Sequence, residues 1–197
     1  MTSRFTLCCA IVLLFGACSG PDLPISFYHW KAKAEYGKRI QQTLDQANSG
    51  SVYLHLFDIE VKEEPSISND GVFPTYLIQD IDDGFKSKHI IPVVFISNEV
   101  FKQLQSFTPE QKDWDQKSLA QRVILLIQQI ATSHDLPAMK RLQIDCDWTE
   151  STRDAYFNFL TELSITYELE ATIRLHQIKY PKRTGVPPVN RGTLMLY

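Results

Sequence analysis

Apolar runs of strand length alternate along the chain with longer segments in which apolar residues recur every three or four positions. The first pattern predicts β-strands and the second predicts amphipathic helices. The run over residues 89–97 is almost wholly apolar, which is typical of a strand covered on both faces in a parallel sheet. The pattern predicts strands over 25–30, 51–58, 89–97, 141–148, 169–176 and 192–197, helices over 35–48, 115–134 and 151–167, a short helix over 99–107 and an unassigned element over 74–79.

Strands that alternate with helices at this spacing predict βαβ units and an α/β fold with a parallel sheet. Two architectures compete, an open doubly wound sheet and a (β/α)8 TIM-like barrel. No glycine-rich phosphate loop follows the first predicted strand, so the dinucleotide-binding form of the open sheet loses its main support. A barrel builds its site at the carboxyl ends of its strands. Polar residues gather at those ends here, and we therefore favour the barrel. These polar residues are His29, Asp58, Asn98, Asp145, Asp147, Arg174 and His176.

The length of the chain does not match a whole barrel. A (β/α)8 barrel usually takes about 250 residues, whereas this chain has 197 and its last apolar run reaches the final residue. Six strands are predicted in place of eight. We expect a partial barrel domain over residues 25–197, truncated at its C-terminal side, with a reduced and open relative of the barrel as the alternative.

The N-terminal residues follow a different pattern. Arg4 precedes an apolar run over residues 5–15, which is shorter than the roughly twenty residues that span a bilayer, and small residues follow it. Residues 15–18 (FGAC) resemble the bacterial lipobox, whose cysteine is lipidated and becomes the new N-terminus; plain secretory cleavage is the alternative. The prediction is a signal peptide over 1–17, a lipidated Cys18 with a short tether over 18–24, and a cell-envelope protein anchored to the membrane by lipid.

Charge and cysteine content remove several function classes. With 20 basic and 23 acidic residues the net charge is -3, so no positive field exists to attract nucleic acid, and we expect no nucleic-acid partner. Cys146 is the only cysteine after Cys18, which excludes a disulfide within the mature chain. The five histidines are dispersed and form no HExxH motif, so neither a metal nor a cofactor is predicted.

The segment over residues 143–150 (QIDCDWTE) is the richest in candidate chemistry. Residues two apart share a face of a strand, so Asp145 and Asp147 point together while Cys146 points towards the helices. The two aspartates then lie about 7 Å apart along the strand. Like charges at this spacing raise the pKa of one carboxyl group, which can then act as a general acid. The structural alternative pairs one aspartate with Arg174 and lets the other cap the next helix.

The same segment resembles the end of the fourth strand in family 18 chitinases and related (β/α)8 glycoside hydrolases, where alternating aspartates precede Trp-Glu and the glutamate is the acid. Thr149 separates Trp148 from Glu150 here, so the resemblance implies Asp147 or Glu150 as the acid and Asp145 as its catalytic neighbour. Together with residues 27–31 (FYHWK) and 171–177 (ATIRLHQ), most of the chain more closely resembles uncharacterised Bacteroidetes lipoproteins with a glycosidase-like barrel, which implies no assigned reaction.

Other residues are candidates for substrate binding. An inward Arg174 would lower the pKa of one aspartate and hold it ionised, and His176 could contact a substrate; a structural ion pair is the alternative. Trp30 and Trp148 offer flat ring faces on which sugars stack, unless the two rings are buried in the core. The predicted substrate-binding residues are His29, Trp30, Asp58, Asn98, Trp148, Arg174 and His176.

These features predict a cell-envelope lipoprotein with a glycoside-hydrolase-like domain that acts on or binds a polysaccharide or glycan. The alternative is a non-catalytic glycan- or protein-binding lipoprotein on the same scaffold. Hydrolysis of glycosides distinguishes the two hypotheses.

Overall fold

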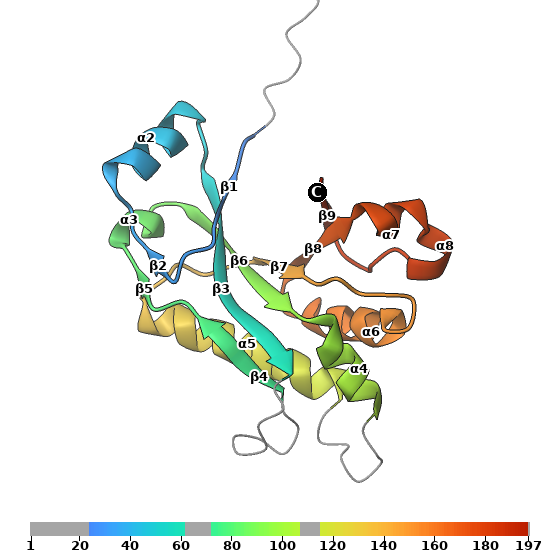
Figure 1. Cartoon of the computed structure of the whole chain (residues 1–197). Helices are drawn as coiled ribbons and strands as arrows, with labels where there is room; N and C mark the ends of the chain where they lie inside the picture. Colours follow the sequence, from blue (N-terminus) through green and yellow to red (C-terminus); the bar gives the residue numbers. More distant parts are fainter. Residues whose placement is uncertain (1–23, 62–71, 107–114, 197) are drawn as a thin grey trace, which may run out of the picture.

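The main sheet has seven strands within the described residues, and six of them run parallel in a spatial order that follows their order in the chain. The structure is a computed structural model that describes residues 24–61, 72–106 and 115–196 (Figure 1). Strand β4 (Val72–Leu77) pairs antiparallel with β3, and the short strands β2 (Lys33–Ala34) and β5 (Asp80–Ile81) form a separate parallel pair. The six parallel strands of the main sheet are β1 (Phe27–His29), β3 (Ser51–Val61), β6 (His89–Ile96), β7 (Arg141–Asp145), β8 (Glu168–Arg174) and β9 (Arg191–Met195).

Helices connect most of the neighbouring strands. The connections use α2 (Lys38–Gln46), α3 (Asp83–Lys86), α4 (Asn98–Ser106), α5 (Gln116–Ser133), α6 (Arg153–Leu163), α7 (Leu175–Lys179) and α8 (Pro181–Thr184). The strand order of a doubly wound sheet reverses at a switch point, whereas the order here never reverses. The fold is therefore α/β with a curled parallel half-barrel sheet, consistent with an incomplete TIM-like barrel, and the fold prediction is confirmed.

Side-chain contacts across distant strands show the curl of the sheet. The hydroxyl of Tyr28 on β1 donates to Gln143 Oε1 on β7 at 2.8 Å, although β3 and β6 lie between these strands. Three strand intervals amount to about 14 Å in a flat sheet. Tyr53 on β3 likewise donates to Glu170 on β8 at 2.7 Å. These four residues therefore lie on the concave face of the sheet, which corresponds to the interior of a barrel.

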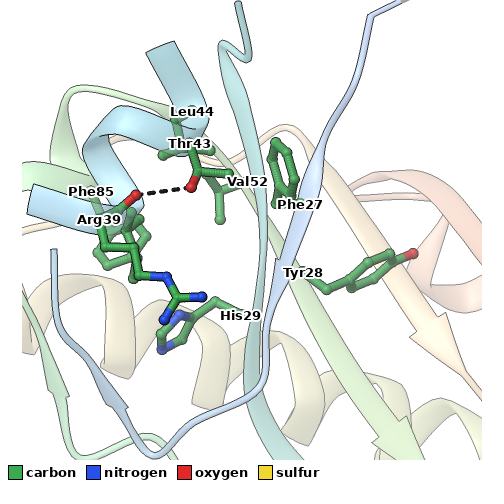
Figure 2. A pocket seen from close by; sticks show the side chains of 9 residues that line it. Phe27, Tyr28, His29, Arg39, Thr43, Leu44, Val52 and Phe85 are labelled. Carbon is green, nitrogen blue, oxygen red and sulfur yellow. Dashed lines mark hydrogen bonds between the residues drawn. The ribbon is translucent and has the colours of Figure 1, made fainter. Parts of the chain in front are cut away.

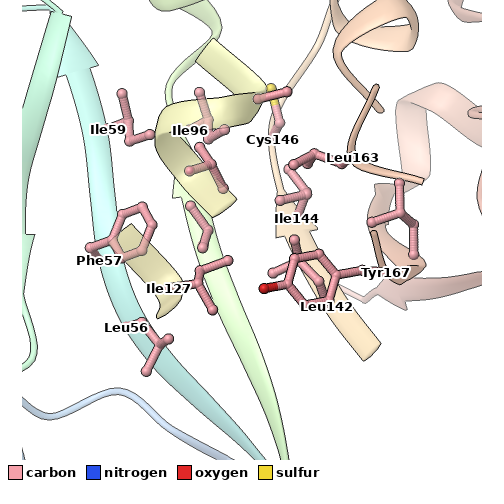
Figure 3. Packing of buried hydrophobic residues seen from close by; sticks show 14 of the residues in the cluster. Leu56, Phe57, Ile59, Ile96, Ile127, Leu142, Ile144, Cys146, Leu163 and Tyr167 are labelled. Atoms are coloured by element: carbon pink, nitrogen blue, oxygen red, sulfur yellow. The ribbon is translucent and has the colours of Figure 1, made fainter. Parts of the chain in front are cut away.

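The hydrophobic core lies between the other face of the sheet and the helices. Figure 3 shows Ile96 of β6, Ile144 of β7 and Cys146, which directly follows β7, in one cluster with Leu163 of α6. Cys146 is a free, buried cysteine on the helix side, as strand parity predicts. Burial of each large apolar side chain stabilises the fold by about 1.5–3 kcal/mol. Helix α5 buries four such residues, spaced three and four apart along one face: Leu119, Val123, Ile127 and Ile130.

Two strands end earlier than the sequence pattern predicts. β7 ends at Asp145, so Asp147 and Trp148 lie in the loop that follows it. β8 ends at Arg174, and helix α7 begins at the next residue, so His176 is helical. The alternation of faces along a strand therefore does not apply to these last residues.

The predicted signal peptide over residues 1–17, the lipidated Cys18 and nearly all of the tether over 18–24 lie outside the described residues. In the part of the chain that the structure describes, no helix has the length and apolar character needed to cross a membrane.

Candidate functional site

A buried charge cluster occupies the amino-terminal part of the concave face. Arg141 Nε on β7 donates to Glu170 Oε1 on β8 at 2.6 Å, and its Nη2 donates to the Tyr53 hydroxyl at 3.1 Å. The Glu170 side chain is only 2% exposed, and Tyr53 donates to its second oxygen. Burial, followed by the hydrogen bond to Glu170, raises the pKa of Tyr53 to about 12. These three side chains are hydrogen-bonded to one another and occupy the concave face near the amino-terminal ends of the strands.

The next level towards the carboxyl ends of the strands is neutral. Gln143 Oε1 accepts a hydrogen bond from the Tyr28 hydroxyl, and Gln143 Nε2 donates a hydrogen bond to Thr193 Oγ1 on β9 at 3.0 Å. This chain of hydrogen bonds joins β1, β7 and β9 across the concave face. Burial is the main cause of a raised pKa for Tyr28, so its hydroxyl acts as a hydrogen-bond donor rather than as a charged group.

Asp145, Asp147 and Arg174 form one cluster at the carboxyl ends of β7 and β8. Arg174 Nη2 lies 3.1 Å from Asp145 Oδ1, and Arg174 Nε donates to Asp147 Oδ1. Thr172 Oγ1 also donates to Asp145 Oδ1 at 2.6 Å. The predicted contact between the two aspartates and the arginine of the neighbouring strand is confirmed. The cluster carries one more negative than positive formal charge.

The two aspartates of this cluster differ in their access to solvent. The side chain of Asp145 is 8% exposed, whereas that of Asp147 is 54% exposed. Burial raises the pKa of Asp145, against the opposing effects of the Thr172 hydrogen bond and the Arg174 charge. Asp147 is therefore the carboxylate that a ligand can reach, and Asp145 belongs to the support beneath it.

Gln177 of α7 fixes the backbone on both sides of this cluster. Its Oε1 accepts the backbone N–H of Arg174 at 2.7 Å, and its Nε2 donates to the carbonyl of Trp148 at 3.1 Å. One buried amide thus ties the end of β8 to the loop after β7, so the arginine and the exposed aspartate are held at a fixed separation.

A second polar group lies across the concave face on β3. His55 Nε2 is 2.6 Å from Asp58 Oδ1, and the imidazole packs between the rings of Trp30 and Tyr76 at 4.5 and 4.7 Å. Trp30 is 42% exposed and also stacks on Tyr28. Of the predicted substrate-binding residues, Trp30, Asp58 and Arg174 therefore lie on the concave face together with the two aspartates.

His29 points away from this face. Figure 2 shows its imidazole and Tyr28 on opposite sides of β1. His29 lines a hollow of about 200 Å³ against α2, with Phe27, Phe85 and Arg39 among its other walls. The concave face is therefore not the place where His29 would meet a ligand.

Glu150 and His176 also lie elsewhere. Both line a hollow of about 210 Å³ with Arg183 of α8, and Arg183 Nε donates to Glu150 Oε2 at 2.7 Å. The early end of β8 turns His176 into this hollow, because the helix that begins at Leu175 breaks the alternation of the strand. The contacts of Glu150 are with Arg183 rather than with the aspartate cluster.

Two further predicted residues have structural surroundings. Trp148 is fully buried, stacks on Tyr156 at 5.1 Å and donates from Nε1 to the Thr184 carbonyl at 2.8 Å. It offers no exposed ring face to a sugar, which corrects the expectation of a stacking platform. Asn98, at the start of α4, accepts a hydrogen bond from Thr152 at 2.5 Å and so joins the first turns of α4 and α6.

Several residues of the concave face were not predicted from the sequence. His55 is the most important of them, and Tyr53 and Glu170 are the others. Strand parity alone marks Gln143 as a neighbour of Asp145. Nothing in the local pattern marks His55, because its position depends on how β3 pairs with β6.

Within residues 24–61, 72–106 and 115–196, no group of three or more His, Cys, Asp or Glu side chains could hold a metal ion. The chemistry available on the concave face is that of carboxylates, the guanidinium groups of Arg141 and Arg174, the imidazole of His55, amide and hydroxyl groups, and aromatic rings. Comparison of the chain with protein-family models, with curated proteins and with solved structures finds no match.

Proposed function

We propose that the concave face binds a carbohydrate and that Asp147 acts on a glycosidic bond of it. The observation that carries this proposal is the bridging of a buried and an exposed carboxylate by Arg174 at the carboxyl ends of β7 and β8. Catalytic groups of (β/α)8 barrels lie at that end of the strands. The exposed Trp30 ring, which packs against His55 on the same concave face, offers a face for a sugar.

The roles follow from access to solvent. Asp147 is exposed, and we assign it the transfer of a proton to the leaving oxygen. Asp145 and Arg174 are largely buried and set the charge around it. The resemblance of residues 144–150 to family 18 chitinases supports the choice of reaction. Glu150 pairs with Arg183 instead, and this favours Asp147 over Glu150 as the acid.

Removal of the Asp147 carboxyl group is expected to slow hydrolysis strongly. A panel of oligosaccharides and methyl glycosides, whose alkoxide leaving groups need a proton, is incubated with the wild type and with Asp147→Asn, which keeps the size of the side chain. General acid catalysis contributes about 10²- to 10⁴-fold, so kcat should fall by that factor. Asp154→Asn is the matched control, because Asp154 is an exposed aspartate of α6 paired with Arg153, and its kcat should equal that of the wild type. Equal rates for Asp147→Asn and the wild type would contradict the role of Asp147.

A non-catalytic glycan-binding protein is the second candidate. It is favoured by the complete pairing of the aspartate cluster, in which Arg174 engages both carboxylates and Thr172 adds a hydrogen bond. Such a fixed surface suits recognition as well as catalysis. Binding of an oligosaccharide that is lost in Trp30→Ala, together with no hydrolysis of any glycoside in the panel, would favour this candidate over the enzyme.

We also propose that the protein is a cell-envelope lipoprotein anchored through Cys18. This rests on the apolar run and the FGAC segment at residues 15–18. Cells labelled with radioactive palmitate should yield a labelled wild-type protein and an unlabelled Cys18→Ala variant, because alanine has no thiol to acylate. A label that persists in Cys18→Ala would refute the anchor.

A further inference from the structure

A hollow on the helix side of β1 has apolar walls. It has a volume of about 200 Å³ and is lined by residues of β1, β3, α2 and α3, on the side of β1 that faces away from the aspartate cluster (Figure 2). Its buried lining residues are Leu44, Val52 and Phe85, each at most 2% exposed, and Phe27 and Ile40 add partly buried apolar surface. Such walls receive an apolar group in preference to water.

Arg39 of α2 adds a positive charge to this apolar hollow. Figure 2 shows its guanidinium directed towards the imidazole of His29, and both side chains line the hollow. Among the described residues, no carboxylate pairs with Arg39 and no acidic residue lines the hollow. A guanidinium carries five N–H donors in a planar fork that matches a carboxylate. The charge of the hollow is therefore complementary to an organic anion.

The other polar side chains of the lining already have partners in the protein. His29 Nε2 lies 3.2 Å from the Lys33 carbonyl oxygen, and it carries the proton there because a carbonyl only accepts. The His29 ring also packs edge-on against Phe85, with 5.4 Å between the ring centroids. The Thr43 hydroxyl donates to the Arg39 carbonyl at 2.9 Å. The guanidinium is therefore the lining group whose donors are left for a ligand.

We propose that this hollow is a second binding site, which takes a small carboxylate with a short apolar body. The body lies against the buried apolar walls, and the carboxylate pairs with Arg39. Pockets for drug-sized ligands have about 300–1,000 Å³. A hollow of about 200 Å³ suits a smaller body, such as the alkyl chain of hexanoate. The site is separate from the concave face and does not depend on the function proposed above.

Probes of equal chain length separate the contribution of charge from that of apolar contact. Hexanoate, hexanol and hexylamine are titrated into the full chain, and ligand-observed NMR gives the Kd of each. Hexanoate should bind with a Kd on the order of 1 mM. Hexanol should bind about tenfold more weakly, because it lacks the charge that pairs with Arg39. Hexylamine, which Arg39 repels, should bind more weakly still. Equal affinities for hexanoate and hexanol, or no binding of hexanoate, would overturn the proposal.

Variants of α2 then locate the bound probe. Arg39→Gln should weaken hexanoate about tenfold and leave the affinity for hexanol unchanged. Lys38→Gln is the matched control, because Lys38 is an exposed cation next to Arg39 that does not line the hollow, and its hexanoate affinity should equal that of the wild type.

A larger side chain at the exposed lining residue Thr43 tests the apolar part of the site. Thr43→Phe adds a ring at the hollow and should abolish binding of both hexanoate and hexanol, with a melting curve to show that the variant is folded. Hexanoate binding that is unchanged in Arg39→Gln or in Thr43→Phe would mean that the probe binds elsewhere, and it would refute this site.

Discussion

Arg174→Ala is expected to lower the free energy of unfolding by about 3 kcal/mol at pH 7, because it leaves the carboxylate of Asp145 buried without its counter-charge. The loss should be smaller at pH 4, by about 1 kcal/mol or more, since one pKa unit corresponds to about 1.4 kcal/mol. Chemical denaturation of the wild type and of Arg174→Ala at pH 7 and pH 4 measures these losses of unfolding free energy.

The sign of this pH dependence follows from Asp145. Its pKa in the folded protein is raised by burial, and Arg174 opposes that increase. Without Arg174 the pKa of the folded state rises further. A carboxyl group with a raised pKa gives its full stability below the pKa of the unfolded chain and loses it as the pH rises through the folded value. Arg174→Ala therefore loses more of its unfolding free energy at pH 7 than at pH 4.

Arg183→Ala is the matched control for Arg174→Ala. It also removes a guanidinium from a carboxylate, but Arg183 and Glu150 are both exposed to solvent. Exposed ion pairs contribute little, so its unfolding curves should overlay those of the wild type at both pH values. An equal loss at pH 7 and pH 4 in Arg174→Ala would contradict a buried pair with Asp145.

Arg141→Ala is expected to lower the free energy of unfolding by about 3–5 kcal/mol at pH 7. Glu170 is more deeply buried than Asp145, and among the described residues it would keep only the Tyr53 hydroxyl as a close partner. Arg191 Nη1 lies 3.8 Å from Glu170 and offers only a weaker substitute. Thermal and denaturant unfolding of the variant measure this loss.

The double variant Arg141→Met with Glu170→Leu isolates the cause. Apolar side chains of similar volume remove both charges at once, and buried pairs replaced in this way often lose no stability. The double variant should therefore recover most of the stability that Arg141→Ala loses. A double variant as unstable as Arg141→Ala would mean that packing, rather than an uncompensated charge, determines the loss.

The contact between Arg174 and the two aspartates could be predicted because it needs only two properties of the chain. Strand parity places Asp145 and Arg174 on the same face, and sequential parallel strands place β7 beside β8. The same parity failed for His176, because β8 ends sooner than its apolar run and a helix begins at Leu175. Strand ends depend on pairing with neighbours, which local composition does not record.

His55 could not be predicted for a related reason. A regular strand through residues 51–58 would turn His55 and Asp58 to opposite faces, and only the shifted pairing with β6 brings them together. The contacts of Tyr28 with Gln143 and of Tyr53 with Glu170 depend on the curl of the whole sheet. Curl is a property of all the strands together, so no single segment of sequence predicts these pairs.

The polar residues of β8 have a consequence for folding that does not depend on any reaction. Glu170, Thr172 and Arg174 alternate with apolar residues that face the helices. A slip of β8 by one residue would turn both charges into the apolar layer. A slip by two would keep the faces but separate Glu170 from Arg141 and Arg174 from Asp145. Only the native alignment satisfies both conditions, so the charged interior distinguishes the correct strand register from its nearest competitors.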